Sequence, residues 1–186
     1  MTITTVNPAT EEILAEYPEM SGSQIEDVLH HTDSAFNTWR RVPLSDRAEL
    51  LRTLAVKLRE GEADFAALMT REMGKPLAQA EGEVRKCASA CDYYADNAAL
   101  FLADQVIESD ASQSYLTYQP LGVVLAIMPW NFPFWQVIRF AAPTITAGNT
   151  GILKHAPNVT GCIVTGIVLC FNRTAPLDVQ DRFLIN

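Results

Sequence analysis

The chain has 186 residues, a formal net charge of −8 at pH 7 and 48% hydrophobic residues. This balance is typical of a globular protein with a sizeable core and excludes a disordered chain. The acidic charge argues against a nucleic-acid partner and against an anionic membrane surface, because the sequence offers no basic stripe to neutralise phosphates. No basic-then-apolar leader and no apolar run of membrane-spanning length is visible, so we expect no membrane segment.

The four cysteines and three histidines form no pattern of metal ligands or catalytic groups. Cys87 and Cys91 are four residues apart on one face of a predicted helix, where thiols usually pack as small apolar side chains. Cys162 and Cys170 lie on a later apolar segment. We therefore expect structural thiols, no metal site and a reducing, cytoplasmic location.

Residues 1–110 predict a mainly helical layer. Two short strands, over 2–6 and 12–17, flank a turn of sequence Asn-Pro-Ala-Thr. Ser21 and Ser23 are candidate caps for the first helix. Apolar residues at helical spacing predict four helices, over approximately 25–39, 45–60, 61–74 and 77–102.

The pattern changes after the helical layer. Alternation over 113–119 predicts a half-exposed strand within the segment 111–120. Residues 121–186 then predict strand, helix, strand, helix and strand, over 123–128, 134–147, 151–154, 161–171 and 182–185. The expected fold class is α/β, in which an N-terminal helical layer leads into a partial, Rossmann-like parallel sheet within one domain, 1–186.

Two motifs follow the first two strands of this predicted sheet. Pro-Trp-Asn-Phe-Pro, 129–133, comes after a near-continuous apolar run that is typical of a buried strand, and Lys-His-Ala-Pro, 154–157, ends the next strand. Ligands of open α/β sheets bind outside the carboxyl ends of the strands. Asn131 and Lys154 therefore lie where a site is expected.

These motifs give the chain a resemblance to the aldehyde dehydrogenase superfamily, and within it to the succinate-semialdehyde dehydrogenases. The resemblance covers essentially the whole chain, and its matching segments are 6–10, 71–76, 126–133, 147–149 and 152–158. It implies that the chain corresponds to an N-terminal part of such an enzyme. The family's nucleophilic cysteine and general-base glutamate would then lie in other regions, and we expect the isolated chain to be inactive.

Asn131 matches the family's oxyanion donor, whose side-chain amide stabilises the negative oxygen that forms when a thiol attacks an aldehyde. Loss of one such donor typically costs about 3 kcal/mol of transition-state stabilisation. The alternative is that Asn131 only closes the turn before Phe132 and Pro133, as asparagine often does.

The resemblance also implies an NAD or NADP site. Lys154 matches the lysine that binds the adenosine ribose, although it could be an ordinary exposed lysine at a strand end. Many relatives carry a glutamate close behind this lysine, whereas Pro157 leaves no carboxylate to repel a 2′-phosphate, so we expect NADP to be accepted at least as well as NAD. The residues expected to line the cofactor site are Ile127, Met128, Pro129, Trp130, Lys154, His155, Ala156 and Pro157.

Arg139 matches the carboxylate-binding arginine of succinate-semialdehyde dehydrogenases. An arginine in so apolar a segment needs a partner, which could be either a buried acid or the carboxylate of the substrate. Trp135 and Phe132 would form an apolar wall around a short substrate, although both could equally be core residues.

Two functions are therefore compatible with the sequence. The first is the N-terminal part of an NAD(P)-dependent dehydrogenase that oxidises a small-molecule aldehyde, with succinic semialdehyde as the expected substrate and a cysteine thiohemiacetal as the intermediate. The second is a non-catalytic module that binds nucleotide or assembles subunits. The resemblance implies a homo-oligomer in which the strand at 111–120 pairs between subunits.

Overall fold

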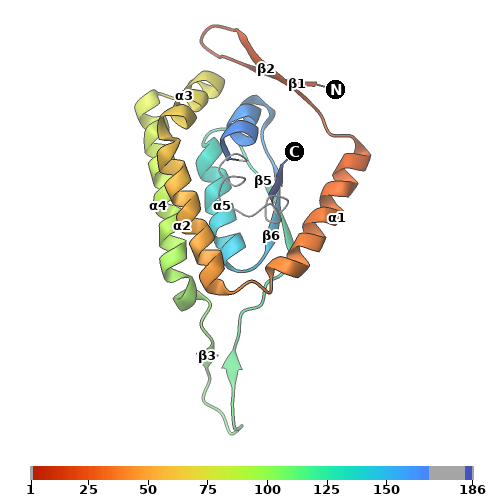
Figure 1. Ribbon diagram of the computed structural model, residues 1–186, viewed down its shortest axis with the longest axis vertical. Helices are drawn as coiled ribbons and strands as arrows, with labels where there is room; N and C mark the ends of the chain where they lie inside the picture. The colour runs from red at the N-terminus through yellow and green to blue at the C-terminus, as the bar shows by residue number, and fades with distance from the viewer. Residues whose placement is uncertain (1, 168–182, 186) are drawn as a thin grey trace.

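The computed structural model describes residues 2–167 and 183–185 (Figure 1). A hairpin of two antiparallel strands, β1 (Thr2–Val6) and β2 (Ile13–Pro18), begins the chain. Four helices follow, which are α1 (Gly22–Trp39), α2 (Leu44–Glu60), α3 (Glu62–Met73) and α4 (Leu77–Phe101). None of the helices in this described part is long and apolar enough to cross a membrane.

The helix boundaries follow from local chemistry. Ser21 caps α1 and forms a capping box with Gln24, as its predicted capping role requires. Gly74 ends α3 with φ 71°, a left-handed conformation that glycine adopts without steric cost. Pro76 directly precedes α4, where the missing N–H of proline leaves no hydrogen bond unmade.

The second half of the chain forms a parallel sheet with the strand order β5-β6-β7. Its strands are β5 (Val123–Ile127), β6 (Thr150–Lys154) and β7 (Phe183–Ile185), and α5 (Pro133–Thr146) connects the first two. The 3₁₀ turn η1 (Pro157–Val159) and the π-helix η2 (Cys162–Ile167) follow β6. The predicted helix 161–171 is thus described as far as residue 167, while Cys170 and Arg182 lie outside the described residues.

The helical layer and the sheet share one hydrophobic core. α4 packs against α2, α3 and α5, and α1 contacts β5, β6 and β7 from the other side of the molecule (Figure 1). At the centre of this core, the Phe134 ring lies 5.2 Å from that of Phe65, centroid to centroid, which joins α5 to α3. The predicted helical layer on a Rossmann-like sheet is therefore confirmed.

The expectation that the first sheet strand is buried on both faces is wrong. Ala126 is buried, but Leu125 and Ile127 are 62% and 73% exposed. β5 lies at the edge of the described sheet, and Leu125 and Ile127 share the face opposite to Ala126, where the core does not cover them. Side chains of a strand alternate between the two faces, so every second residue stays exposed.

The strand predicted over 113–119 is much shorter in the structure. Only β4 (Tyr115–Leu116) is extended and paired, and its antiparallel partner is β3 (Gln105–Val106), which the sequence pattern did not indicate. The hairpin projects from the end of the molecule where β5 begins (Figure 1). Besides the two-residue ladder, the Ile107 N–H donates to the Ser114 carbonyl over 2.8 Å and Gln105 Nε2 donates to the Tyr118 hydroxyl over 3.2 Å.

Candidate active site

The carboxyl ends of β5 and β6 meet, as the two motifs predict. The parallel register pairs Ile127 with Lys154, and the Met128 N–H donates to the Lys154 carbonyl over 2.9 Å. This bond joins the turn after β5 to the loop after β6. The turn containing Asn131 and the loop 154–157 therefore form one edge of the sheet.

This edge is open to ligands. Asn131, Phe132 and Lys154 are exposed, and Trp130 is 50% exposed. The Lys154 ammonium donates to the carbonyl of His155 over 2.8 Å, so the side chain folds back along its own loop. A ligand at this edge would have to turn the Lys154 side chain outward before binding it.

His155 differs from the other residues expected at the cofactor site because its side chain is buried. Its Nδ1 lies 3.0 Å from the Ala156 carbonyl, and since that oxygen can only accept, Nδ1 carries the proton. Burial lowers the pKa of His155, which favours a neutral ring. His155 therefore shapes the loop from inside and leaves contact with a ligand to its backbone and its neighbours.

The N-terminus of α5 is capped from a distant part of the chain. Phe132, at the N-cap position, offers no side-chain acceptor, and Pro133 supplies the first helical residue. Glu83 of α4 provides the cap instead, because its Oε1 accepts from the N–H groups of Phe134 and Trp135 over 3.0 and 2.9 Å. A buried carboxylate thus stabilises the positive end of the helix directly behind Asn131.

Lys75 completes this arrangement. Its ammonium pairs with Glu83, donates to the Asn131 carbonyl over 3.4 Å and lies 3.7 Å from the centre of the Phe132 ring. The sequence pattern did not single out Lys75 or Glu83. The spacing did contain a signal, because Glu83 lies three residues after Ala80 and four before Cys87, on the predicted buried face of α4.

Gln136 is a further site residue that the sequence analysis missed. Its Nε2 donates to Asn131 Oδ1 over 3.5 Å, which leaves the amide nitrogen of Asn131 as the end available for a ligand. Arg139 follows Gln136 by three residues, so both lie on one face of α5, about one helical turn apart. The hydrogen bond thus joins Asn131 to Gln136, and helical spacing places Arg139 on the same face of α5 as Gln136.

The expectation that the Arg139 side chain is buried is wrong. Its side chain is exposed, and no ion pair to it exists within residues 2–167 and 183–185. Trp135, one helical turn earlier, is half-buried with the Lys86 ammonium 3.8 Å from its ring centre. Arg139 thus remains available to an external carboxylate.

Glu72 caps the next helix in the same manner as Glu83 caps α5. This buried residue of α3 accepts from the N–H of Gly161 over 2.9 Å and from that of Cys162 over 2.7 Å. Helix N-termini at this edge of a sheet commonly bind phosphate. Here both are occupied by carboxylates of the protein, so a nucleotide would have to place its phosphates elsewhere.

The buried thiols do not act as nucleophiles in this arrangement. Burial is the main reason why the pKa values of Cys87 and Cys162 lie far above the usual range for a thiol. The carboxylate of Glu83 raises the pKa of Cys87 further, and that of Glu72 raises the pKa of Cys162. The thiolate, not the thiol, is the reactive form. Cys87 and Cys162 are therefore packing residues.

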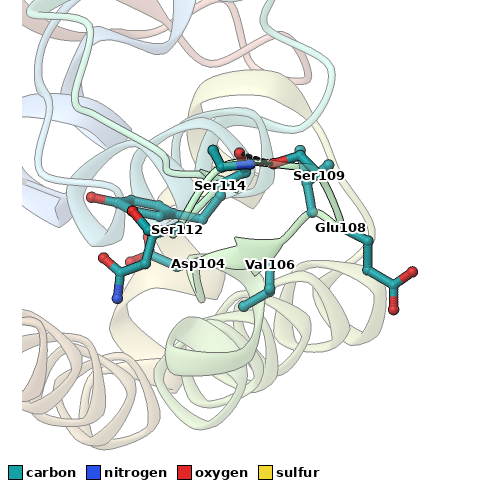
Figure 2. A pocket seen from close by; sticks show the side chains of 10 residues that line it. Asp104, Val106, Glu108, Ser109, Ser112 and Ser114 are labelled. Atoms are coloured by element: carbon teal, nitrogen blue, oxygen red, sulfur yellow. Dashed lines mark hydrogen bonds between the residues drawn. The ribbon is translucent and has the colours of Figure 1, made fainter.

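A separate concave surface of about 460 Å³ lies within the β3–β4 hairpin (Figure 2). Its lining comes from residues 104–115, among which the hydroxyls of Ser109 and Ser114 are 2.7 Å apart. None of the residues expected at the active site contributes to it. We therefore assign the candidate site to the sheet edge at Asn131.

A parallel β-α-β unit with polar side chains at the carboxyl ends of its strands defines a Rossmann-like, nucleotide-binding class of protein. The chain belongs to the aldehyde dehydrogenase family, whose family model matches residues 1–179. It is 50% identical over 162 residues to a probable succinate-semialdehyde dehydrogenase (NADP+) of Synechocystis sp., which covers 87% of this chain and 36% of that protein. It is 46% identical over 157 residues to the succinate semialdehyde dehydrogenase Sad of Escherichia coli, covering 84% and 34% of the two chains.

Solved structures agree with this assignment. A succinic semialdehyde dehydrogenase from Streptococcus pyogenes, in complex with NADP+, matches with a TM-score of 0.91 and 33% identity over 98% of this chain and 40% of that chain. The protein Gox0499 matches with a TM-score of 0.93 and 32% identity over 100% and 40%. The chain thus spans roughly a third of the length of its curated relatives, 36% of the Synechocystis protein.

Proposed function

We propose that this chain supplies the oxyanion donor, the substrate-carboxylate anchor and part of the cofactor groove for the NAD(P)-dependent oxidation of succinic semialdehyde, or of a similar short aldehyde, to the acid. The observation that carries the proposal is the bond between Asn131 and Gln136 beside the joined ends of β5 and β6, with the exposed Arg139 on the same face of α5 as Gln136. The names of the Synechocystis and Escherichia coli relatives support this substrate and cofactor class.

Asn131 would act on the carbonyl oxygen of the aldehyde. When the cysteine thiolate of a whole dehydrogenase of this family adds to the carbonyl carbon, the C=O π electrons move to the oxygen, which becomes an oxyanion. The amide nitrogen of Asn131 would donate a hydrogen bond to it, while Gln136 holds the amide oxygen and so fixes which end of the amide faces the substrate.

Arg139 would select the substrate. Its exposed guanidinium can bind a carboxylate through two parallel hydrogen bonds. Arg139 lies on the same face of α5 as Gln136, farther along the helix from Asn131. One end of a short substrate could therefore be bound by Arg139 while the aldehyde end reacts at Asn131. Trp135 and Phe132 would contribute apolar walls: Trp135 is half-buried and Phe132 is 44% exposed, each with a lysine ammonium over its ring.

The nicotinamide nucleotide supplies the hydride acceptor when it is bound. Ile127, Met128, Pro129 and Trp130 would line its groove, and Lys154 would bind the ribose after leaving the His155 carbonyl. Since the exposed Pro157 adds no negative charge to this loop, we propose that NADP binds at least as well as NAD.

The cofactor proposal can be tested on the chain itself. Titration of the 186-residue protein with NADPH and with NADH should quench Trp130 fluorescence, and Lys154→Met should weaken binding of both nucleotides. The Trp130→Phe variant is the control for the fluorescence signal, because it removes the fluorescent reporter but keeps the charge of Lys154. A preference of about tenfold or more for NADH would contradict the role given to Pro157.

The reaction can be tested in a chimera in which residues 1–167 replace the matching part of the Synechocystis relative, which is 50% identical over 162 residues. Asn131→Ala should lower kcat with succinic semialdehyde by about a hundredfold or more. Arg139→Ala should raise KM for succinic semialdehyde but not for butanal, which has the same chain length without the carboxylate. An Asn131→Ala chimera with unchanged kcat would refute the proposal.

Subunit assembly is a second candidate role, favoured by the β3–β4 hairpin. Val106, Ile107, Tyr115 and Leu116 expose apolar side chains on a segment that projects from the rest of the chain (Figure 1). Such a hairpin could pair with a strand of another copy through its free edge. Light scattering would test this, since Val106→Lys together with Leu116→Lys should give monomers while the parent chain associates.

A further inference from the structure

The ion pair between Lys75 and Glu83 is the most deeply buried one in the described part of the chain. The two side chains are 6% and 1% exposed, whereas every side chain of the other described pairs is at least 26% exposed. A buried pair is weak as a source of stability, because desolvation offsets much of the attraction between the charges. Its retention in a core therefore calls for another explanation.

Each member of the pair uses its remaining hydrogen-bonding capacity on the same short segment. Glu83 accepts from the N–H groups of Phe134 and Trp135, and Lys75 donates to the carbonyl of Asn131. The segment 131–135 is therefore held at both of its ends. These contacts bridge 51 to 56 residues of sequence, so they connect separate layers of the fold and not neighbouring turns of one element.

The two charges depend on each other in this geometry. The Glu83 carboxylate is paired with Lys75 and accepts from two N–H groups of a helix N-terminus. Lys75 in turn gains a carboxylate, a carbonyl and an aromatic face. Removing either group would leave the other one charged and incompletely solvated beside Asn131.

We infer that Lys75 and Glu83 are positioning residues for Asn131: they hold the backbone of 131–135 so that the Asn131 amide faces the reacting carbonyl. This inference rests on the oxyanion role proposed for Asn131. Neither residue touches the substrate, and the pair acts through the main chain of the turn. Fixing a catalytic group to within a fraction of an ångström is a known requirement of efficient catalysis.

The three tryptophans of the chain allow a direct test by ¹⁹F NMR after labelling with 5-fluorotryptophan. Trp130 and Trp135 flank Asn131, while Trp39 is buried on α1 with its Nε1–H donating to Ile145 over 3.0 Å, and it serves as an internal reference for folding. Glu83→Ala and Lys75→Met should shift or broaden the Trp130 and Trp135 signals and leave the Trp39 signal sharp.

A double variant separates positioning from loss of folding. Lys75→Met combined with Glu83→Gln removes both charges together and keeps an acceptor oxygen for the α5 N-terminus. It should hold the Trp135 signal near its original position and displace that of Trp130, because the bond to the Asn131 carbonyl is lost. The matched control is Arg52→Met with Asp96→Asn, which removes an exposed pair between α2 and α4 and should move none of the three signals.

The outcomes decide the inference. Unchanged Trp130 and Trp135 signals in the folded single variants, or an unchanged Trp130 signal in the double variant, would overturn it. In the chimera the double variant should lower kcat roughly tenfold to a hundredfold with little change in KM. A displaced turn together with full activity of the Asn131→Ala chimera would instead refute the proposed function while leaving the structural coupling intact.

Discussion

Replacing Glu72 by alanine is expected to destabilise the protein by about 2–6 kcal/mol. The carboxylate accepts from the N–H groups of Gly161 and Cys162, and all three groups are buried. Each buried N–H that loses its acceptor costs about 1–3 kcal/mol, and two of them are orphaned together. Glutamine in this position would keep one of the two acceptor oxygens, so Glu72→Gln should lose about half as much.

Urea denaturation followed by far-UV circular dichroism would measure these losses. Since each kcal/mol corresponds to about 2–4 °C for a domain of this size, the alanine variant should also melt at least about 4 °C lower. Glu60→Ala is the matched control, because Glu60 lies at the exposed end of α2 and pairs only with Lys57 among the contacts described. It should change the free energy of unfolding by less than about 0.5 kcal/mol.

Two results would refute the reasoning about Glu72. An alanine variant as stable as the control would mean that water or a shifted backbone satisfies the two N–H groups. A glutamine variant less stable than the alanine variant would mean that the amide donor is harmful, so that the retained acceptor oxygen has no net value.

Three further changes test other parts of the structure. Phe134→Ala should cost about 3–5 kcal/mol of stability in the same denaturation assay, because the ring is fully buried against Phe65 and its loss leaves a large cavity. Gly148→Ala should lower the melting temperature, since its φ of 86° disfavours any side chain and the added methyl group would meet the Arg47 guanidinium; an unchanged melting temperature would contradict this geometry. His155→Gln should flatten the loss of stability on acidification: burial lowers the folded pKa of His155 below its ordinary 6.5, so the unfolded chain binds the proton first and stability falls as the pH drops below about 6.5. Equal slopes for the two proteins in unfolding experiments from pH 7 to pH 5 would exclude that role of His155.

Local chemistry made much of this fold predictable. The capping box at Ser21, the left-handed Gly74 and the apolar periodicity of α2 and α4 are properties of a few neighbouring residues, and each can be recognised in the sequence. The parallel pairing that brings Asn131 and Lys154 together was predictable for a related reason, since carboxyl ends of adjacent parallel strands share one edge.

Features that depend on distant partners were not predictable in this way. The exposed Leu125 belongs to an apolar run that would be equally compatible with burial on both faces, and only the arrangement of the helices decides. The β3 strand at Gln105 exists only through its pairing with Tyr115 and Leu116. Glu83 and Lys75 look like ordinary helix and loop charges until the fold brings the α5 N-terminus to them.

The two capping glutamates also bear on whether the parts of the chain could fold separately. Glu83 and Glu72 belong to the helical layer, yet the helices whose first N–H groups they satisfy belong to the sheet half. A fragment that begins near residue 121 would have both helix starts uncapped and the Phe134 face uncovered. The sheet half is therefore not an independent module in folding: the helical layer caps its helices, and the two halves should unfold in a single cooperative transition.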